Sequence, residues 1–284
     1  MSQQSNSSEQ AQDLPLPTGH FVTLDSGLTL HYLDKGQGPA VIWLHGSGPG
    51  ASGFSNFKGN FPEFVEAGYR NIILDLPGFG RSDKPDDVNY DLAFFVEALN
   101  GLIEKLGLSD VTLLGNSLGG AIALGQTLKY PDTIAKLILM APGGVEERET
   151  YFEMEGIARM VEVYARGPMG VEQMREVMSL QLFDSSGLTD DILAERSAVA
   201  VTQPENLFST MLVPNMTEQL KDIDVPVLGF WGTNDIFNPP AGVHKFLDNM
   251  PSARFILLNQ CGHWVQVEHQ RLFNTSCIDF LQND

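Results

Sequence analysis

Val111-Thr112-Leu113-Leu114-Gly115-Asn116-Ser117-Leu118-Gly119 is the stretch that decides the fold of this chain. Its first four residues form a short apolar run typical of a buried strand, and a helical pattern follows from Ala121 to Lys129. Glycines flank Ser117 in a Gly-x-Ser-x-Gly motif and allow the backbone to turn sharply there. Strand, sharp turn and helix together predict a nucleophile elbow with Ser117 as catalytic nucleophile. The alternative is a plain glycine-rich turn.

A serine nucleophile needs a base and a carboxylate, which follow it in the chain order Ser, Asp, His in this architecture. Asp235 follows an apolar strand-like run that ends at Trp231, and His263 follows another that ends at Leu258. Because the carboxyl ends of parallel strands meet at one edge of a sheet, we expect the three side chains to converge. His263 would accept the serine proton and Asp235 would orient the imidazole. A turn role for Asp235 and a structural role for His263 remain open.

The apolar pattern along the chain predicts an α/β fold. Two alternating segments around Asp25-Ser26-Gly27 predict an opening hairpin, and helical patterns such as Leu92 to Leu106 lie between later strands. With the hairpin, six further runs predict a mostly parallel eight-stranded sheet with flanking helices, the α/β-hydrolase fold. These runs are Ala40 to Leu44, Asn71 to Leu74, Val111 to Leu114, Lys136 to Met140, Pro226 to Trp231 and Arg254 to Leu258.

The segment between the fourth and fifth of these runs is too long for a simple connection, so we expect a helical insertion there. The predicted organisation is a disordered tail (1–14), a first part of the core (15–143), a helical lid (144–215) and a second part of the core (216–284). Seven of the ten methionines fall in or near this lid. They are consistent with an apolar substrate pocket or with ordinary helix packing, so none is named as a site residue.

Composition limits the possible partners. The formal net charge of −19 argues against nucleic acid and anionic membranes, so an anionic substrate would need a local cation. No apolar run approaches the ~20 residues of a membrane helix, and the polar residues 1–13 do not read as a signal peptide. Two cysteines, Cys261 and Cys277, give no disulfide framework, and no Cys/His group has zinc-ligand spacing. We expect a cytoplasmic enzyme without a metal or cofactor.

The loop Gly48-Pro49-Gly50-Ala51-Ser52-Gly53 offers two readings. It matches the dinucleotide-binding pattern Gly-x-Gly-x-x-Gly, with Asp75 at about the distance of a ribose-binding acid. Beside an elbow serine, the same region has another use. The backbone N–H groups of Ser47 and Leu118 would form an oxyanion hole, and we favour this reading.

Several motifs together resemble the meta-cleavage product hydrolases, carbon–carbon bond hydrolases of the α/β-hydrolase fold. The resemblance covers roughly residues 20 to 282 and is weakest across the lid. It implies water-dependent cleavage of a 2-hydroxy-6-oxohexa-2,4-dienoate to 2-hydroxypenta-2,4-dienoate and a carboxylic acid, and a homo-oligomer of two or more copies. The motifs are His45 to Ala51, Ser55-Asn56, Asp75 to Ser82, Gly115 to Gly120 and Cys261 to His269.

The resemblance also implies substrate-binding roles for four residues. Asn56 and Asn116 would bind the dienoate end, Trp264 would form a pocket wall, and Arg196 would bind the 2-oxo/carboxylate group. A guanidinium suits a carboxylate because it offers paired hydrogen bonds. The alternatives are a helix-start residue for Asn56, a turn residue for Asn116, core packing for Trp264 and a solvated lid cation for Arg196.

Two other functions remain open: an ordinary carboxylesterase, which needs the triad but not Arg196, and a binding protein that keeps the fold without turnover. The group on the distal carbonyl of the substrate is not decided by the sequence.

Overall fold

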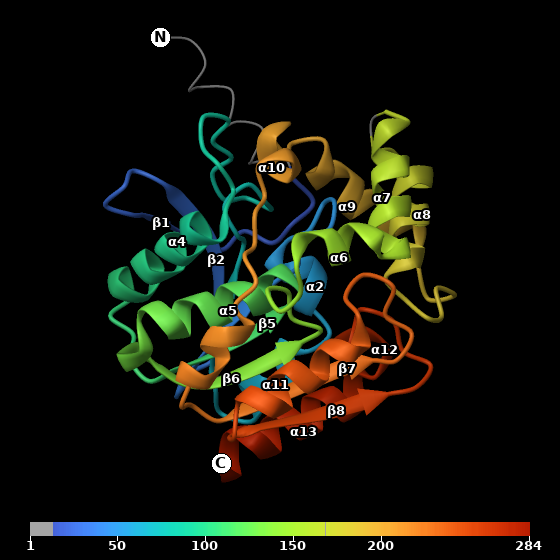
Figure 1. Ribbon diagram of the computed structural model, residues 1–284. Helices are drawn as coiled ribbons and strands as arrows, with labels where there is room; N and C mark the ends of the chain where they lie inside the picture. The colour runs from blue at the N-terminus through green and yellow to red at the C-terminus, as the bar shows by residue number, and fades with distance from the viewer. Residues whose placement is uncertain (1–13, 168) are drawn as a thin grey trace.

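A computed structural model of the chain describes residues 14–167 and 169–284 (Figure 1). The predicted disordered tail therefore lies outside the described residues, except for Leu14. That residue is buried together with Leu16 against Val199 of the lid, and the Arg81 guanidinium donates hydrogen bonds to the carbonyl oxygens of Leu14 and Leu16 at 2.7 and 2.8 Å. We call Leu14 to Leu16 the N-terminal strap.

An eight-stranded sheet organises the molecule, in the order β1-β2-β4-β3-β5-β6-β7-β8. Strand β2 pairs antiparallel with β1 and β4, and all other pairs are parallel, which confirms the predicted fold. The six predicted apolar runs agree with the observed strands to within two residues at each end, whereas the second strand of the hairpin extends to Lys35. Their bounds are β1 His20–Thr23, β2 Thr29–Lys35, β3 Ala40–Leu44, β4 Arg70–Leu74, β5 Val111–Asn116, β6 Ile134–Met140, β7 Val227–Gly232 and β8 Ala253–Leu258.

Helices cover both faces of the sheet because the central strands are apolar on both sides. In β3, Ile42 and Leu44 pack with α4, α5 and α11 on one face, whereas Val41 and Trp43 pack with α2, α3 and α13 on the other. The core helices are α2 Gly53–Phe57, α3 Phe61–Glu66, α4 Leu92–Lys105, α5 Leu118–Lys129, α11 Val243–Asn249, α12 Val265–Glu268 and α13 Gln270–Asn283. Short 3-10 helices are η1 Pro131–Thr133, η2 Thr217–Asp222 and η3 Pro240–Gly242.

Five helices between β6 and β7 lie over the carboxyl-terminal side of the sheet (Figure 1). They have a small core of their own, in which Met174, Val177 and Leu193 pack with Trp264 from the far end of the chain. The predicted lid segment 144–215 contains all five. These helices are α6 Arg148–Glu153, α7 Glu155–Ala165, α8 Val171–Leu180, α9 Asp190–Ala200 and α10 Asn206–Ser209.

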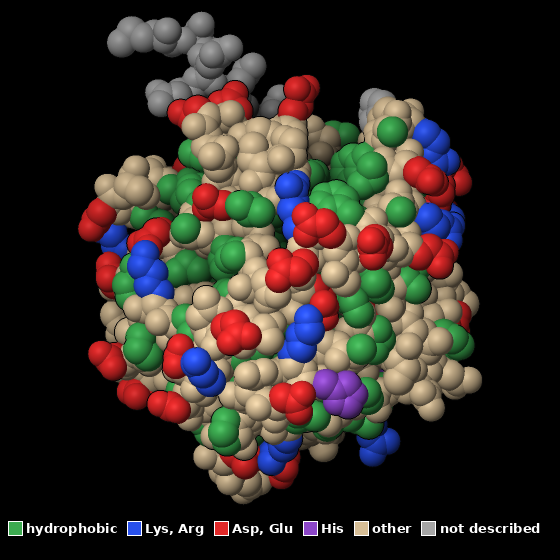
Figure 2. Space-filling model, viewed as in Figure 1, with side chains coloured by type: hydrophobic (Ala, Val, Ile, Leu, Met, Phe, Trp, Pro, Cys, Tyr) green, Lys and Arg blue, Asp and Glu red, His purple; other side chains and the backbone are tan. Residues whose placement is uncertain are grey.

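Acidic side chains outnumber basic ones on the face seen in Figure 2. Within the described residues, no helix is long and apolar enough to cross a membrane.

Candidate active site

Ser117 lies at the turn between β5 and α5 in a strained conformation. Its φ of 53° and ψ of −112° are unusual for a residue with a side chain, a cost of about 1–3 kcal/mol that the surroundings must offset. Its N–H donates to the Met140 carbonyl at 3.0 Å, and its own carbonyl accepts from Gly143 at 2.9 Å. A side chain at Gly119 would overlap the Leu44 carbonyl, so this turn requires glycine there. The Ser117 side chain is consequently held at the head of the strand, half-buried rather than enclosed.

Asp235 and His263 form a buried pair. The two side chains meet at 2.7 Å, between Asp235 Oδ2 and His263 Nδ1, and the residues are 5% and 4% exposed. The second carboxylate oxygen accepts hydrogen bonds from the N–H groups of Phe237 and Asn238 at 2.8 and 3.0 Å. Because both oxygens of Asp235 are committed, the imidazole has a fixed orientation with Nδ1 facing the acid. Its Nε2 has no hydrogen bond among the described residues, and His263 lines the same cavity as Ser117.

A small cavity is lined by six of the nine predicted site residues, with Leu118, Arg196 and Asp235 outside its lining. Its volume is about 40 Å³, which holds only a few water molecules. A dienoate is larger than this volume, so the surrounding side chains or helices must shift to admit one. The lining residues are Gly46, Ser47, Gly48, Asn56, Asn116, Ser117, Ile157, Met160, Gln181, Phe237, Asn238, His263 and Trp264.

The predicted oxyanion donors are the N–H groups of Ser47 and Leu118, and neither donates a hydrogen bond within the described part of the chain. The Ser47 N–H shares a peptide unit with the Gly46 carbonyl, to which His45 Nδ1 donates at 2.8 Å. His45 Nε2 accepts from the Leu76 N–H at 3.1 Å, so the proton is on Nδ1. Burial lowers the pKa of His45 to about 4, which keeps the ring neutral. His45 thus fixes the orientation of the peptide that carries the Ser47 N–H, one of the two predicted oxyanion donors.

Arg196 lies on α9, is 2% exposed and contacts Trp264, which lines the cavity. Its guanidinium stacks over the Trp264 ring at 5.0 Å and donates to the Pro49 carbonyl at 3.3 Å. Neighbouring Glu195 pairs with Lys58 at 3.2 Å, and among the described residues no carboxylate lies within ion-pair distance of Arg196. Burial lowers the pKa of Arg196 to about 10, against the raising effect of Glu195. Arg196 is therefore a buried cation, not a solvated one.

Asn56 and Asn116 both line the cavity, and each donates to protein carbonyls. The Asn56 amide donates to the Ser52 carbonyl at 2.8 Å. The Asn116 amide donates to the carbonyls of Met140 and His263 at 3.3 and 3.4 Å, while its Oδ1 is buried with no partner among the described residues. Asn116 thus also connects the serine turn to the histidine loop.

Besides Gly46 and Gly48 of the loop after β3, the structure adds five lining residues that the sequence did not predict as site residues: Ile157, Met160, Gln181, Phe237 and Asn238. A usable signal existed for two of them, since Phe237 and Asn238 follow the predicted acid within three positions. For Ile157 and Met160, the spacing of three on a helix was indistinguishable from core packing.

The dinucleotide reading fails on the surroundings of Asp75. Its Oδ2 accepts from His31 Nδ1 at 2.8 Å and from the Arg81 N–H at 2.9 Å, and its Oδ1 accepts from the Gly53 N–H at 2.8 Å. Burial alone would raise the pKa of Asp75, but the hydrogen bond and charge of His31 hold it below its usual value. Both oxygens are used inside the protein, so none is left for a ribose. Among residues 14–167 and 169–284, no three His, Cys, Asp or Glu side chains converge as metal ligands.

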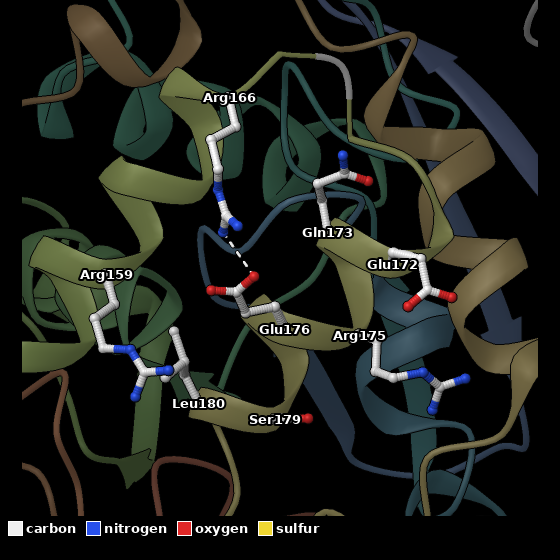
Figure 3. Close-up of a pocket in the computed structure, with 8 residues that line it drawn as sticks. All are labelled: Arg159, Arg166, Glu172, Gln173, Arg175, Glu176, Ser179 and Leu180. Carbon is white, nitrogen blue, oxygen red and sulfur yellow. Dashed lines mark hydrogen bonds and ion pairs between the residues drawn. The ribbon is translucent and has the colours of Figure 1, made fainter.

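A larger hollow, of about 570 Å³, lies on the lid away from these residues, between α7 and α8 (Figure 3). Its arginines already have acidic partners: Arg166 pairs with Glu176 at 2.6 Å, Arg159 with Glu155 at 3.4 Å, and Arg175 with Asp190. The hollow contains no nucleophile and base in contact, so its size does not make it the catalytic site.

Residues 41–275 match the profile of the Alpha/beta hydrolase family. The chain is 38% identical to the 2-hydroxy-6-oxononadienedioate/2-hydroxy-6-oxononatrienedioate hydrolase of Comamonas testosteroni, covering 94% of this chain and 97% of that protein. It is also 38% identical, with the same coverage, to the 2-hydroxy-6-oxo-6-phenylhexa-2,4-dienoate hydrolase of Burkholderia cepacia. Among solved structures, the 2-hydroxy-6-oxo-6-phenylhexa-2,4-dienoate hydrolase of Rhodococcus sp. strain RHA1 is similar, with a TM-score of 0.81, 25% identity and coverage of 93% and 99% of the two chains.

Proposed function

We propose, from the premise that this chain belongs to the α/β-hydrolase family and within it to the meta-cleavage product hydrolases, that it hydrolyses a carbon–carbon bond of a 2-hydroxy-6-oxohexa-2,4-dienoate. The products are 2-hydroxypenta-2,4-dienoate and a carboxylic acid. The observation that carries the proposal is the buried, carboxylate-free Arg196 beside a cavity that contains Ser117 and His263. An ordinary carboxylesterase has no use for such a cation, because its substrates are uncharged at that end.

The residues suit a two-stage reaction. The dienol first becomes a ketone, so that the breaking bond can release a stabilised dienolate. Ser117 then attacks the distal carbonyl while His263 accepts its proton, and the Ser47 and Leu118 N–H groups receive the developing oxyanion. When the carbon–carbon bond breaks, its electron pair moves into the dienolate, which is protonated. Water activated by His263 finally releases the acid from Ser117.

The two ends of the substrate would lie on opposite sides of Ser117. Arg196 contacts the loop after β3, and Phe237 follows β7, while β5 with the serine lies between β3 and β7 in the sheet. The dienoate carboxylate would thus face Arg196, with Asn56 and Asn116 along the cavity and Trp264 as its wall. The distal group would face Phe237 and Ile157.

We further propose that the distal group is an uncharged alkyl or aryl group. Ile157, Met160 and Phe237 are apolar, Gln181 and Asn238 are neutral, and no Lys or Arg is among the cavity-lining residues that the structure describes. A second carboxylate at that end would lose its hydration without gaining a cation. This choice matters because relatives of equal identity carry names with a phenyl-substituted and a dicarboxylic substrate.

The test is a panel of ring-fission products with methyl, phenyl or carboxyethyl groups on the distal carbonyl, followed by loss of the yellow dienolate absorbance. We expect kcat/KM for the phenyl or methyl compound to exceed that for the dicarboxylate by about tenfold or more. A preference for the dicarboxylate would refute the distal-group assignment, and no turnover of any member would refute the proposed function.

The protein is also proposed to act in the cytoplasm as a homo-oligomer. Both cysteines are free and buried, and burial raises the pKa of Cys261 to about 12, as fits thiols that stay reduced. Strand β8 is at the edge of the sheet with Leu257 46% exposed, which a second copy could cover.

A further inference from the structure

Glu268 joins two segments that are far apart in sequence. It is the last residue of α12, and its Oε2 accepts a hydrogen bond from the Gly262 N–H at 2.6 Å. Its Oε1 accepts from the N–H groups of Phe183 and Asp184 at 2.7 and 3.0 Å. One carboxylate therefore satisfies three backbone donors, one beside the catalytic histidine and two in the lid.

The same two segments also touch directly. The His263 N–H donates to the Gln181 carbonyl at 2.8 Å. A Cβ on Gly262 would lie 2.7 Å from that carbonyl oxygen and 3.0 Å from the Leu182 carbonyl carbon, so the two backbones are packed as closely as glycine allows. We call Gln181 to Asp184 the lid base. Gln181 and His263 both line the cavity, so this junction sets two of its walls.

We propose that Glu268 is a positioning residue for the triad. By holding the lid base and the histidine loop together, it keeps the His263 ring aligned between Asp235 and Ser117 while other parts of the lid move to admit substrate. The cavity of about 40 Å³ is too small for a dienoate, so its walls must move apart when substrate binds. The lid base is held by two hydrogen bonds to Glu268 and one to His263, and α7 contacts the loop after β7 through the Gly156 N–H and the Ile236 carbonyl at 2.8 Å.

This inference rests on the proposed triad but not on the identity of the substrate. The substitution Glu268→Gln tests the positioning role. The amide nitrogen of glutamine cannot accept a hydrogen bond from a backbone N–H, so the contact with either the lid base or Gly262 must be lost. We expect kcat and the rate of phosphonylation by a fluorophosphonate each to fall about tenfold, with KM changed by less than about threefold, since a small misplacement of a catalytic group costs rate. In Glu268→Ala the hydrogen bonds to both the lid base and the Gly262 N–H are lost, so kcat and the rate of phosphonylation should each fall about 100-fold.

The matched control is Glu63→Gln, the same chemical change at an exposed position of α3, which should match the wild type. Thermal melts of all variants separate positioning from loss of fold. The inference is overturned if Glu268→Gln keeps kcat and phosphonylation within about twofold of wild type, or if its losses vanish once the unfolded fraction is subtracted. If the wild type cleaves no dienoate while phosphonylation still drops in Glu268→Gln, the proposed function fails and this inference stands.

Discussion

The sheet core and the helical lid differ in how they hold their functional residues. Ser117, Asp235 and His263 all follow strands of one sheet and are fixed by backbone hydrogen bonds and buried partners. The lid presents Ile157 from a helix that buries only two residues, and its neighbour α6 buries none. We therefore expect bond making to depend on the hydrogen-bonded core and selection among substrates to depend on the less buried lid helices. Changes in the core should therefore affect every substrate, and changes in the lid should discriminate among them.

The strongest challenge to this division is Ser117→Ala. Loss of the nucleophile should reduce kcat by about 10⁴-fold or more on dienoates and on p-nitrophenyl esters alike. Stopped-flow absorbance and fluorophosphonate labelling measure the effect, with Ser186→Ala on the lid surface as the control. Retention of ester hydrolysis in the variant would mean that another residue is the nucleophile.

The substitution Arg196→Met tests whether a lid residue discriminates between substrates. Removing the cation should lower kcat/KM about 100-fold on dienoates, because a buried charge-assisted contact is lost, and leave p-nitrophenyl acetate nearly unchanged. The melting temperature should stay equal or rise, since burying an uncompensated guanidinium is costly. Arg159→Met, at the outer hollow, is the control. Equal loss on both substrates would assign Arg196 a structural role instead.

His45 should make the free energy of unfolding depend on pH. Its pKa is about 4 in the folded protein against 6.5 unfolded, so its contribution is complete above about pH 6.5 and is lost as the pH falls toward 4. The free energy of unfolding should decrease by about 3 kcal/mol across that window on account of this residue. Urea unfolding at pH 7.0 and 4.5 should show a smaller decrease in His45→Gln. Parallel curves for the two proteins would contradict the assignment.

Ile157→Ala should have the smallest effect. Enlarging the distal side of the cavity should raise the ratio of kcat/KM for the phenyl over the methyl substrate about fivefold, since a few methylenes are worth only modest selectivity. Reactivity of Ser117 toward the fluorophosphonate should not change. A general loss on both substrates would place Ile157 in support of the catalytic geometry and so break the division between the two regions.

The core could be predicted from the sequence because its signals are local. Gly119 and the apolar run before Ser117 specify the turn, and chain order selects Asp235 and His263. The lid could not be predicted in the same detail. Whether Met160 faces the cavity or the helix core depends on how α7 packs against α8, which no local pattern encodes. Arg196 could be proposed only from the resemblance, since its burial depends on Trp264, 68 positions further along the chain.

The N-terminal strap has a practical consequence for engineering the protein. Leu14 and Leu16 pack on Val199, one turn of α9 after Arg196. The Arg81 guanidinium donates hydrogen bonds to their carbonyl oxygens. Proteolytic trimming past Leu16 would loosen the helix that carries the guanidinium, so a shortened preparation would lose affinity for anionic ligands before it lost esterase turnover.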